Sequence, residues 1–241
     1  PMNKEDGYRK WAVRGSIIFR YVDHGAEHAA RDDINYRLRD RGLYFKSGIS
    51  WGDVTSGDIS FRYQQPGLIF AARAPTIFSD DKFLLAFLNS KLTNYFCGLI
   101  NPTLSFNLVD LNQLPLLPEL TGDIRNVIAF SAESLRQLSE VEWAGFERSW
   151  DFQSLPILTA SPTPTLESNY TTWITQNRDT IAEMRRLEEE NNRLFIDAYG
   201  LQDEITPDVP IEQITLTINP AYRYGGKLTE EELWTRFRQD T

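Results

Sequence analysis

The chain has few of the side chains from which metal and redox sites are usually built. Its 241 residues include one cysteine and two histidines, which excludes a disulfide framework and a cysteine-rich zinc site. The cysteine, Cys97, stands among Tyr95, Phe96 and Leu99, and such apolar surroundings are typical of a buried structural thiol. We therefore predict a packing role for Cys97 and no metal ligands in this chain.

Long apolar runs are also missing. None approaches the roughly 18 residues of a membrane span, and no secretory signal sequence opens the chain, so we expect a cytoplasmic protein with no membrane partner. The apolar and charged fractions, 41% and 24%, are those of an ordinary globular protein, and the length predicts one or two domains. Because neither Pro1-Met2 nor Thr241 matches a recognisable domain boundary, we expect a piece of a longer protein.

Basic residues are outnumbered, and this bears on whether the chain can bind DNA. The net charge is −9, yet residues 1–75 hold twelve Lys and Arg against nine Asp and Glu, a balance of +3, while the remaining residues carry −12. This asymmetry permits a local face that binds a polyanion, and ordinary solvated charge explains it equally well. Arg37, Arg39 and Arg41 would share one face of a strand, as a solvated edge or as a row of phosphate contacts.

A short metal-binding pattern occurs at His24-Gly25-Ala26-Glu27-His28. It matches the H-x-x-E-H of inverted zinc peptidases, in which two histidines one helical turn apart bind zinc and the glutamate acts as the base. That chemistry needs a stable helix and a third ligand, whereas Gly25 weakens the helix and the chain has no further histidine. A polar loop or a short helix is the better interpretation.

The stretch from Lys46 to Pro118 predicts a recognition surface. Its first part interleaves glycines, hydroxyl residues and aromatic rings, a mixture suited to reading base edges and holding phosphates. The same mixture also describes a Gly/Ser-rich turn leading into a strand. Neither of the usual phosphate loops, G-x-x-x-x-G-K-[ST] and G-x-G-x-x-G, occurs. The predicted DNA-contacting residues, drawn from residues 46–63 and 73–78, are Lys46, Ser47, Trp51, Thr55, Ser56, Arg62, Tyr63 and Arg73.

Strands and one helix are expected to carry this surface. Odd-numbered apolar residues between positions 11 and 21 indicate strands with one buried face, and residues 68–72 predict a buried strand. A helix begins at about Asp80, with Ser79 as its N-cap. Its apolar stripe continues past Asn89-Ser90-Lys91, so we predict one amphipathic helix with these polar residues at its centre.

Two long helices are predicted in the second half of the chain. Apolar residues recur at three- and four-residue steps from Asp123 onwards, and again, after a Pro-rich linker at 155–164, between Thr165 and Gly200. The heptad spacing predicts an antiparallel pair with coiled-coil character. Asn177 and Asn191 would lie at seam positions that fix the register, although exposed asparagines on ordinary helices explain the pattern nearly as well.

The last segment predicts a strand and a helix. Residues 211–218 alternate as a strand, and Thr229 with Glu232 forms the capping box of a closing helix. Residues 219–222 resemble the Asn-Pro-Pro-Tyr by which adenine methyltransferases hold an extruded base. Alanine replaces one proline, however, and no glycine-rich motif for the methyl donor precedes it. A turn leaving the strand is the better interpretation, so no catalytic residue is predicted.

The order of several weak motifs resembles a known family. WGDVTSG at 51–57, LAFLNSK at 85–91, NPTL at 101–104 and LP at 114–115 look like the target-recognition region of restriction-modification methyltransferases. The later motifs resemble, more specifically, the adenine-specific methyltransferases (PglX) of BREX phage-defence systems, and they are NR at 192–193, AYGLQDE at 198–204, ITL at 214–216 and NPAYRY at 219–224.

The resemblance implies a parent protein that methylates adenine at N6 in specific DNA sites with S-adenosylmethionine. The present chain would select the DNA sequence, and it would itself hold no cofactor and perform no catalysis. The implied partners are double-stranded DNA, the methyltransferase domain of the same parent chain, other BREX components and phage inhibitors that mimic DNA. Host methylation and phage defence would both depend on this selection.

We therefore predict an α+β fold in which a mixed or antiparallel sheet with short helices precedes a long antiparallel helix pair and a small strand-helix tail. Residues 1–120 would form a DNA target-recognition domain, 121–204 a helical spacer and 205–241 the tail. The competing hypothesis is a protein-interaction module whose acidic helices dock other phage-defence components. Charge reversal at Arg62 and Arg73 is expected to separate the two hypotheses.

Overall fold

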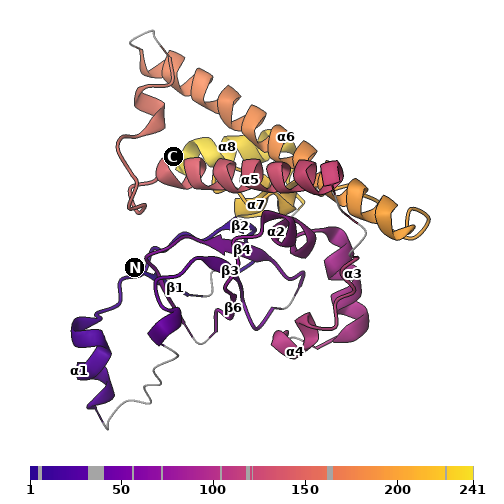
Figure 1. Cartoon of the computed structure of the whole chain (residues 1–241). Coiled ribbons are helices and arrows are strands. Elements are labelled where there is room, and N and C mark those ends of the chain that lie inside the picture. The colour runs from indigo at the N-terminus through magenta and orange to yellow at the C-terminus, as the bar shows by residue number, and fades with distance from the viewer. Residues whose placement is uncertain are drawn as a thin grey trace.

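The computed structural model describes residues 1–241 except 5–6, 32–40, 56, 72, 104, 118–119, 121, 162–164, 226 and 241. Figure 1 shows a small sheet from the first third of the chain, with the long helices and the C-terminal helices lying on one side of it. The predicted α+β class is confirmed. The predicted arginine row lies outside the described residues at positions 37 and 39, and so does the side chain at position 41.

The main sheet is mixed, with strand order β2-β4-β3-β6. β4 runs parallel to β2 and antiparallel to β3, and β3 is antiparallel to β6. A second, two-stranded sheet pairs β1 with β5 in parallel. The strand bounds are Met2–Asn3 for β1, Trp11–Ala12 for β2, Gly48–Trp51 for β3, Phe61–Gln64 for β4, Ile69–Phe70 for β5 and Thr76–Ile77 for β6.

Burial and a close backbone approach define the centre of this sheet. Every residue of β3 is buried, so the strand does not alternate between core and solvent. A Cβ on Gly48 would lie 2.5 Å from the carbonyl oxygen of Ile77, and glycine therefore permits the close approach of β3 to β6. The strands predicted between positions 11 and 21 form only in part, because Trp11 is buried whereas Ile17 is 37% exposed and joins Met2 through a single bridge.

The helix predicted to run through Asn89-Ser90-Lys91 is wrong, because two helices meet there at 61°. Asp81, rather than Ser79, caps the first helix, α2, and Ser90 caps the second, α3, by accepting from the Thr93 amide. Asn89 exchanges two hydrogen bonds with the backbone of Phe61 in β4, of 2.9 and 2.8 Å. A tertiary contact thus sets the break. The bounds are Lys82–Leu88 for α2, Lys91–Ile100 for α3 and Leu108–Leu111 for α4.

The two long helices are confirmed as α5, Gly122–Ala144, and α6, Leu166–Tyr199. They run in opposite directions in Figure 1 and diverge toward the linker, which contains the 3-10 turn Pro156–Leu158. Both predicted seam asparagines are buried, but Asn191 donates to the Ala86 carbonyl of α2, at 3.0 Å. This asparagine therefore ties α6 to the short helices beneath it.

The strand predicted at 211–218 is wrong. A 3-10 turn, Ile211–Gln213, stands there, and consecutive rather than alternate residues from Ile214 to Leu216 are buried. The reason is Asn219, whose side chain donates to the carbonyls of Ile211 and Ile214 and so folds the segment back on itself. The capping box of Thr229 and Glu232 is confirmed at the start of α8, Glu230–Asp240.

One hydrophobic core crosses the boundaries predicted at 120/121 and 204/205. It joins Trp51 and Phe87 to Leu135 of α5, Phe195 of α6 and Phe237 of α8. The three predicted units therefore share a core. Their separate roles as recognition domain, spacer and tail stay a prediction. In the described part of the chain no single helix is both long and apolar enough to cross a membrane, and only the bent pair α2 and α3, taken together, reaches that length and composition.

Candidate nucleic-acid interface

Three loops from distant parts of the sequence meet at one end of β3. Asp53 joins them, because its amide donates to the carbonyl of Arg73 at 3.4 Å and its carbonyl accepts from the amide of Phe106 at 3.0 Å. An antiparallel bridge between Val54 and Ser105 adds to the connection. We call this the three-loop surface, and its described residues belong to 52–58, 71–75 and 101–107.

The scaffold beneath the three-loop surface is rigid. Trp51 is fully buried, and its indole nitrogen donates to the Phe106 carbonyl at 3.0 Å. In the third loop, the Asn101 side chain accepts from the Thr103 amide and hydroxyl and donates to the Ser105 carbonyl. Hydrogen bonds within and between the loops therefore hold their shape before any ligand arrives.

Exposed groups of several kinds lie on this surface. The Arg73 side chain is 65% exposed and stands 3.9 Å from the Asp53 carboxylate. Thr103 and Ser105 are exposed, and so is the apolar side chain of Val54. The surface thus offers one cation, several hydroxyl groups and a small apolar contact, which suits contact with base edges better than tight binding of many phosphates.

The structure separates the predicted DNA-contacting residues into groups. Thr55 and Arg73 belong to the three-loop surface, and Ser56 lies outside the described residues. Lys46, Ser47 and Tyr63 stand near the opposite end of β3, because Ile49 at the start of this strand pairs with Tyr63. The predicted set therefore does not form one contiguous patch.

Tyr63 is already engaged within the protein. Its hydroxyl donates to Asp80 at 2.8 Å, and the ammonium of Lys82 lies 3.2 Å from its ring centroid. Burial and the hydrogen bond to Asp80 raise the pKa of the Tyr63 hydroxyl. Ser47 also hydrogen-bonds to Asp80 and helps to lower the pKa of that carboxyl. Tyr63 and Ser47 thus serve the junction of the sheet with α2, and Lys46 remains exposed beside them.

Two of the predicted contacts are corrected by burial. Trp51 is 0% exposed and Arg62 is 1% exposed, so DNA would reach either side chain only if the fold opened. Both residues lie on the central strands β3 and β4. The sequence predicts contacts here because arginine and tryptophan are common in DNA interfaces, whereas sheet pairing and the covering helices bury both side chains.

A polar cleft of about 430 Å³ adjoins the three-loop surface. Its walls come from the first loop, from the N-terminal segment and from the 3-10 turn Ile211–Gln213. They include Tyr8, Thr55, Asp58, Glu212 and Gln213. The Gln213 amide nitrogen donates to the Asp58 carboxylate at 3.1 Å. Neither lysine nor arginine is among the described residues that line the cleft. The sequence carried no local signal for this pair, because 155 positions separate its members.

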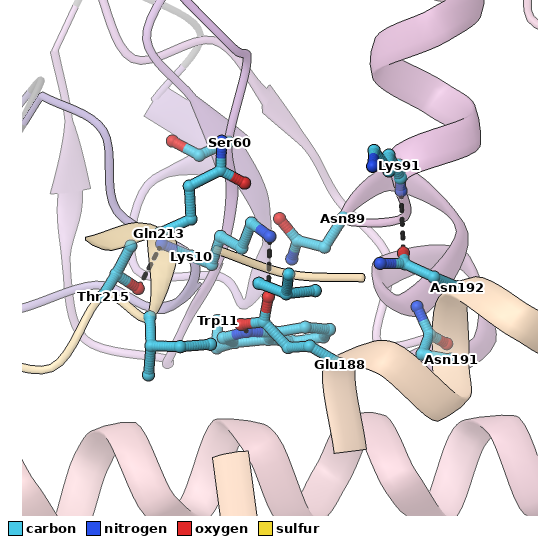
Figure 2. Close-up of polar contacts among 12 residues, drawn as sticks. Lys10, Trp11, Ser60, Asn89, Lys91, Glu188, Asn191, Asn192, Gln213 and Thr215 are labelled. Carbon is cyan, nitrogen blue, oxygen red and sulfur yellow. Dashed lines mark hydrogen bonds and ion pairs between the residues drawn. The ribbon is translucent and has the colours of Figure 1, made fainter. Parts of the chain in front are cut away.

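A layer of buried polar contacts lies behind the cleft, between the sheet and α6 (Figure 2). The Lys10 ammonium stands 2.7 Å from one oxygen of Glu188, and the Trp11 indole donates to the other at 2.7 Å. The Lys10 amide donates to the hydroxyl of Thr215, and the Arg9 amide to that of Ser60, both at 3.0 Å. We call this set the polar layer, and it fixes four chain segments, around residues 10, 60, 188 and 215, relative to one another.

Opposing effects act on the ionisable groups of the polar layer. Burial is the largest single effect on Lys10 and lowers its pKa, but Glu188 and Tyr8 together outweigh burial and raise the pKa. Burial raises the pKa of the Tyr8 hydroxyl, and Glu188 adds to this effect while Lys10 opposes it. Lys10 therefore keeps its proton at neutral pH and its 2.7 Å contact with Glu188, and the polar layer is structural.

The two motif matches have structural roles. Asn219 is 1% exposed and caps α7, Pro220–Tyr224, by accepting from the Ala221 amide, and the Tyr222 hydroxyl donates to the Tyr8 carbonyl at 2.6 Å. His24 lies in the 3-10 turn Val22–Gly25 and His28 in α1, Ala26–Ala29, so no continuous helix carries both. Within the described residues no cluster of three or more His, Cys, Asp or Glu could hold a metal ion.

Cys97 is 8% exposed, and burial raises the pKa of its thiol to about 12. The predicted burial of this thiol is confirmed. A thiol with so high a pKa is almost entirely protonated at neutral pH and is a poor nucleophile.

Known proteins were compared with the chain as a whole. No family model matches it. It is 32% identical over 221 residues to the adenine-specific methyltransferase PglX of Lacticaseibacillus casei (strain Zhang), a match that covers 86% of this chain and 18% of that protein. It resembles a segment of PglX. The adenine-specific methyltransferase BrxX of Escherichia coli O9:H4 (strain HS) is 27% identical over 247 residues, which cover 100% of this chain and 19% of that protein.

The resemblance to PglX that the sequence motifs indicated is thereby confirmed. The chain spans about a fifth of the length of these relatives. Their names state an adenine-specific methyltransferase activity for proteins about five times as long, so activity, substrate and partners come to this chain only as a proposal.

Proposed function

We propose that this chain is the DNA target-recognition part of a BREX-type methyltransferase that modifies adenine at N6. The observation that carries the proposal is the joining of three distant loops through Asp53 on a rigid sheet. Recognition residues generally stand on loops that a rigid scaffold positions, and the similarity to PglX and BrxX supports DNA as the ligand. The methyl donor, S-adenosylmethionine, would bind to another part of such a protein.

Contacts from the three-loop surface would divide by chemistry. Arg73 is exposed and can bind a phosphate or the O6 and N7 atoms of guanine. Thr103 and Ser105 can hydrogen-bond to phosphates or to bases, and Val54 can contact a thymine methyl group. Each good bidentate base contact discriminates by about 1 to 3 kcal/mol, so a few contacts suffice for a short site.

Charge limits the affinity of the isolated chain. Its net charge is −9, and the one exposed cation described on the three-loop surface stands beside a carboxylate. Affinity for DNA depends largely on neutralised phosphates, so the isolated chain should bind weakly. Further phosphate contacts would come from the methyltransferase domain of the parent protein. Lys46, at the other end of β3, is exposed and can add one contact if the DNA extends that far.

Binding to DNA that contains the parent's methylation site, compared with scrambled DNA at one salt concentration, tests the proposal. We expect tighter binding to the site, and we expect exchange of residues 52–58 and 101–107 between relatives to change the methylated sequence. Equal binding to both DNAs, together with an unchanged methylated sequence after the exchange, would refute it. A phage inhibitor that mimics DNA should compete for the same surface.

A protein-interaction module is the second candidate, and a different observation favours it. Ile124, Val127 and Phe130 on α5 are 50%, 49% and 75% exposed, and exposed apolar groups at helical spacing are typical of interaction surfaces. Under this hypothesis Phe130→Ser would abolish pull-down of another BREX component and leave DNA binding intact. Arg73→Ala would do the reverse if DNA recognition is the function.

A further inference from the structure

We propose that the polar cleft receives one base that carries an exocyclic amino group, adenine or cytosine, and thereby sets one position of the recognised sequence. This inference rests on the proposed function, because it assumes that the adjoining three-loop surface meets DNA. The cleft is continuous with that surface through Thr55 and Asp58, which line it. A base edge that lies against the first loop would therefore face the cleft.

The chemistry of the cleft walls selects a hydrogen-bond donor. Asp58 and Glu212 are exposed carboxylates, and Gln213 adds an amide oxygen. Gln213 donates to one oxygen of Asp58, which orients that carboxylate and leaves its second oxygen as an acceptor. Carboxylates accept from the N4 amino group of cytosine, and the glutamine amide pairs with the N6 and N7 atoms of adenine.

The same walls disfavour the other ligands that DNA offers. Guanine presents its O6 and N7 acceptors to Arg or Lys in its commonest specific contact, and the described lining includes neither residue type. A phosphate would approach two carboxylates and be repelled. Thymine presents an O4 acceptor and a methyl group, which also leave the carboxylates without a donor. The cleft therefore favours adenine and cytosine, whose exocyclic amino groups can donate to the carboxylates, over guanine, thymine and phosphate.

Space and rigidity fit this role. The volume of about 430 Å³ lies within the roughly 300 to 1,000 Å³ of small-ligand sites and exceeds what one base needs. No atom lies within 4 Å of the position that a Cβ on Gly57 would take, so the backbone there is open to a ligand. Ser60, which lines the cleft, accepts from the Arg9 amide, and Thr215, two residues after Gln213, accepts from the Lys10 amide (Figure 2).

The test selects binding sites for the 241-residue chain from a randomised duplex DNA library. We expect the wild-type chain to enrich sites with an adenine or cytosine at one position. Replacing that base by purine or pyrimidin-2-one, which lack the amino group, should weaken binding by about 5- to 100-fold. Asp58→Asn, which can present an amide donor, should admit guanine or thymine at this position alone. Gln213→Ala should weaken the preference for adenine or cytosine at the same position.

Asp151→Asn is the matched control, because Asp151 is exposed and does not line the cleft. It should leave every selected position unchanged, and circular dichroism should show that all three variants fold. An enriched site that Asp58→Asn and Gln213→Ala leave unaltered overturns the cleft inference while the proposed function stands. No enrichment at all overturns the cleft inference, and it overturns the proposed function as well if the exchange of residues 52–58 and 101–107 also leaves the methylated sequence unchanged.

Discussion

The polar layer and the three-loop surface contain similar side chains in opposite environments. In the polar layer, Lys10 and Glu188 are 6% and 2% exposed and lie 2.7 Å apart. On the three-loop surface, Arg73 is 65% exposed and lies 3.9 Å from Asp53. Buried charges must be paired to be tolerated, whereas an exposed pair of this length contributes little to stability. Arg73 is therefore available to a ligand, and Lys10 is committed to the fold.

This difference shows that residue type alone does not assign a role in this chain. Trp51 and Arg62 are the types expected in a DNA interface, yet both are buried. The cleft residues Asp58 and Gln213 are unremarkable in the sequence, yet the fold brings them to within 3.1 Å of each other. Only the side chains that lie outside the core are accessible to a ligand.

The largest expected effect breaks the polar layer. Lys10→Met leaves Glu188 buried without its cation, and removal of one partner of a buried pair costs roughly 3 to 5 kcal/mol. Urea unfolding followed by circular dichroism measures the loss. Arg186→Met is the matched control, because Arg186 also pairs with glutamates of α6 but is 58% exposed. It should change the free energy of unfolding much less, and equal losses would contradict the distinction between the two regions.

The next effect concerns the floor of the three-loop surface. Trp51→Ala removes a fully buried indole and should cost about 3 to 5 kcal/mol, as do comparable truncations in cores. Any loss of DNA binding should then follow the unfolded fraction, measured by near-UV circular dichroism in the same samples. A well-folded Trp51→Ala chain that has lost DNA binding would instead show that the indole positions the third loop through Phe106, beyond its contribution to stability.

A pH effect of intermediate size comes from Glu142 on α5. Burial raises the pKa of this carboxyl, although Arg9 and Arg14 oppose the shift. The folded chain then holds the proton more tightly than the unfolded chain does, so the stabilisation is full below the ordinary value of about 4.3 and is lost as pH rises through the raised pKa. Glu142→Gln should therefore gain stability relative to wild type as pH rises from 4 toward 7.

Urea unfolding across that pH range measures the gain. Glutamine retains an oxygen to accept from the Ile218 amide, which bonds to Glu142 at 3.0 Å. The exposed Glu147→Gln serves as the control for the pH dependence of the rest of the chain. A stability difference between wild type and Glu142→Gln that does not vary with pH would contradict the buried state of this carboxyl.

The smallest expected effect lies on the three-loop surface. Arg73→Ala should leave the free energy of unfolding nearly unchanged. If Arg73 binds a phosphate, the slope of log affinity against log salt should fall by about 1, which fluorescence anisotropy with a labelled duplex can measure. Arg186→Ala is the control because it removes an exposed arginine far from the loops in sequence. Identical salt slopes for wild type and Arg73→Ala would exclude a phosphate contact at this residue.

Local signals account for the parts of the fold that were predicted correctly. The bounds of α6 follow from Thr165, which caps it, and from Gly200, which ends it with a φ of +68°. The start of α8 follows from Thr229 and Glu232. Such caps act within about four residues, so a single sequence suffices to find them. The burial of Cys97 was also evident from its apolar neighbours.

Distant contacts explain the failures. The apolar stripe through Asn89 continues in the sequence, yet the bonds of Asn89 to Phe61 separate α2 from α3. Residues 211–218 alternate, yet Asn219 bonds back to two of their carbonyls and prevents a strand. In each case a buried polar side chain satisfied backbone groups that regular structure would otherwise have satisfied.

The sequence by itself determined the α+β class, the two long helices and the resemblance to PglX, because periodicity, caps and motif order are properties of short segments. Only the tertiary structure decided which polar residues face solvent, because burial depends on pairs far apart in the chain. Asp58 and Gln213, which are 155 positions apart in the sequence, meet in the wall of the cleft. Trp51 and Arg62, by contrast, are buried by neighbouring elements. The long-range packing of the core therefore determines which of the candidate residues remain exposed to a ligand.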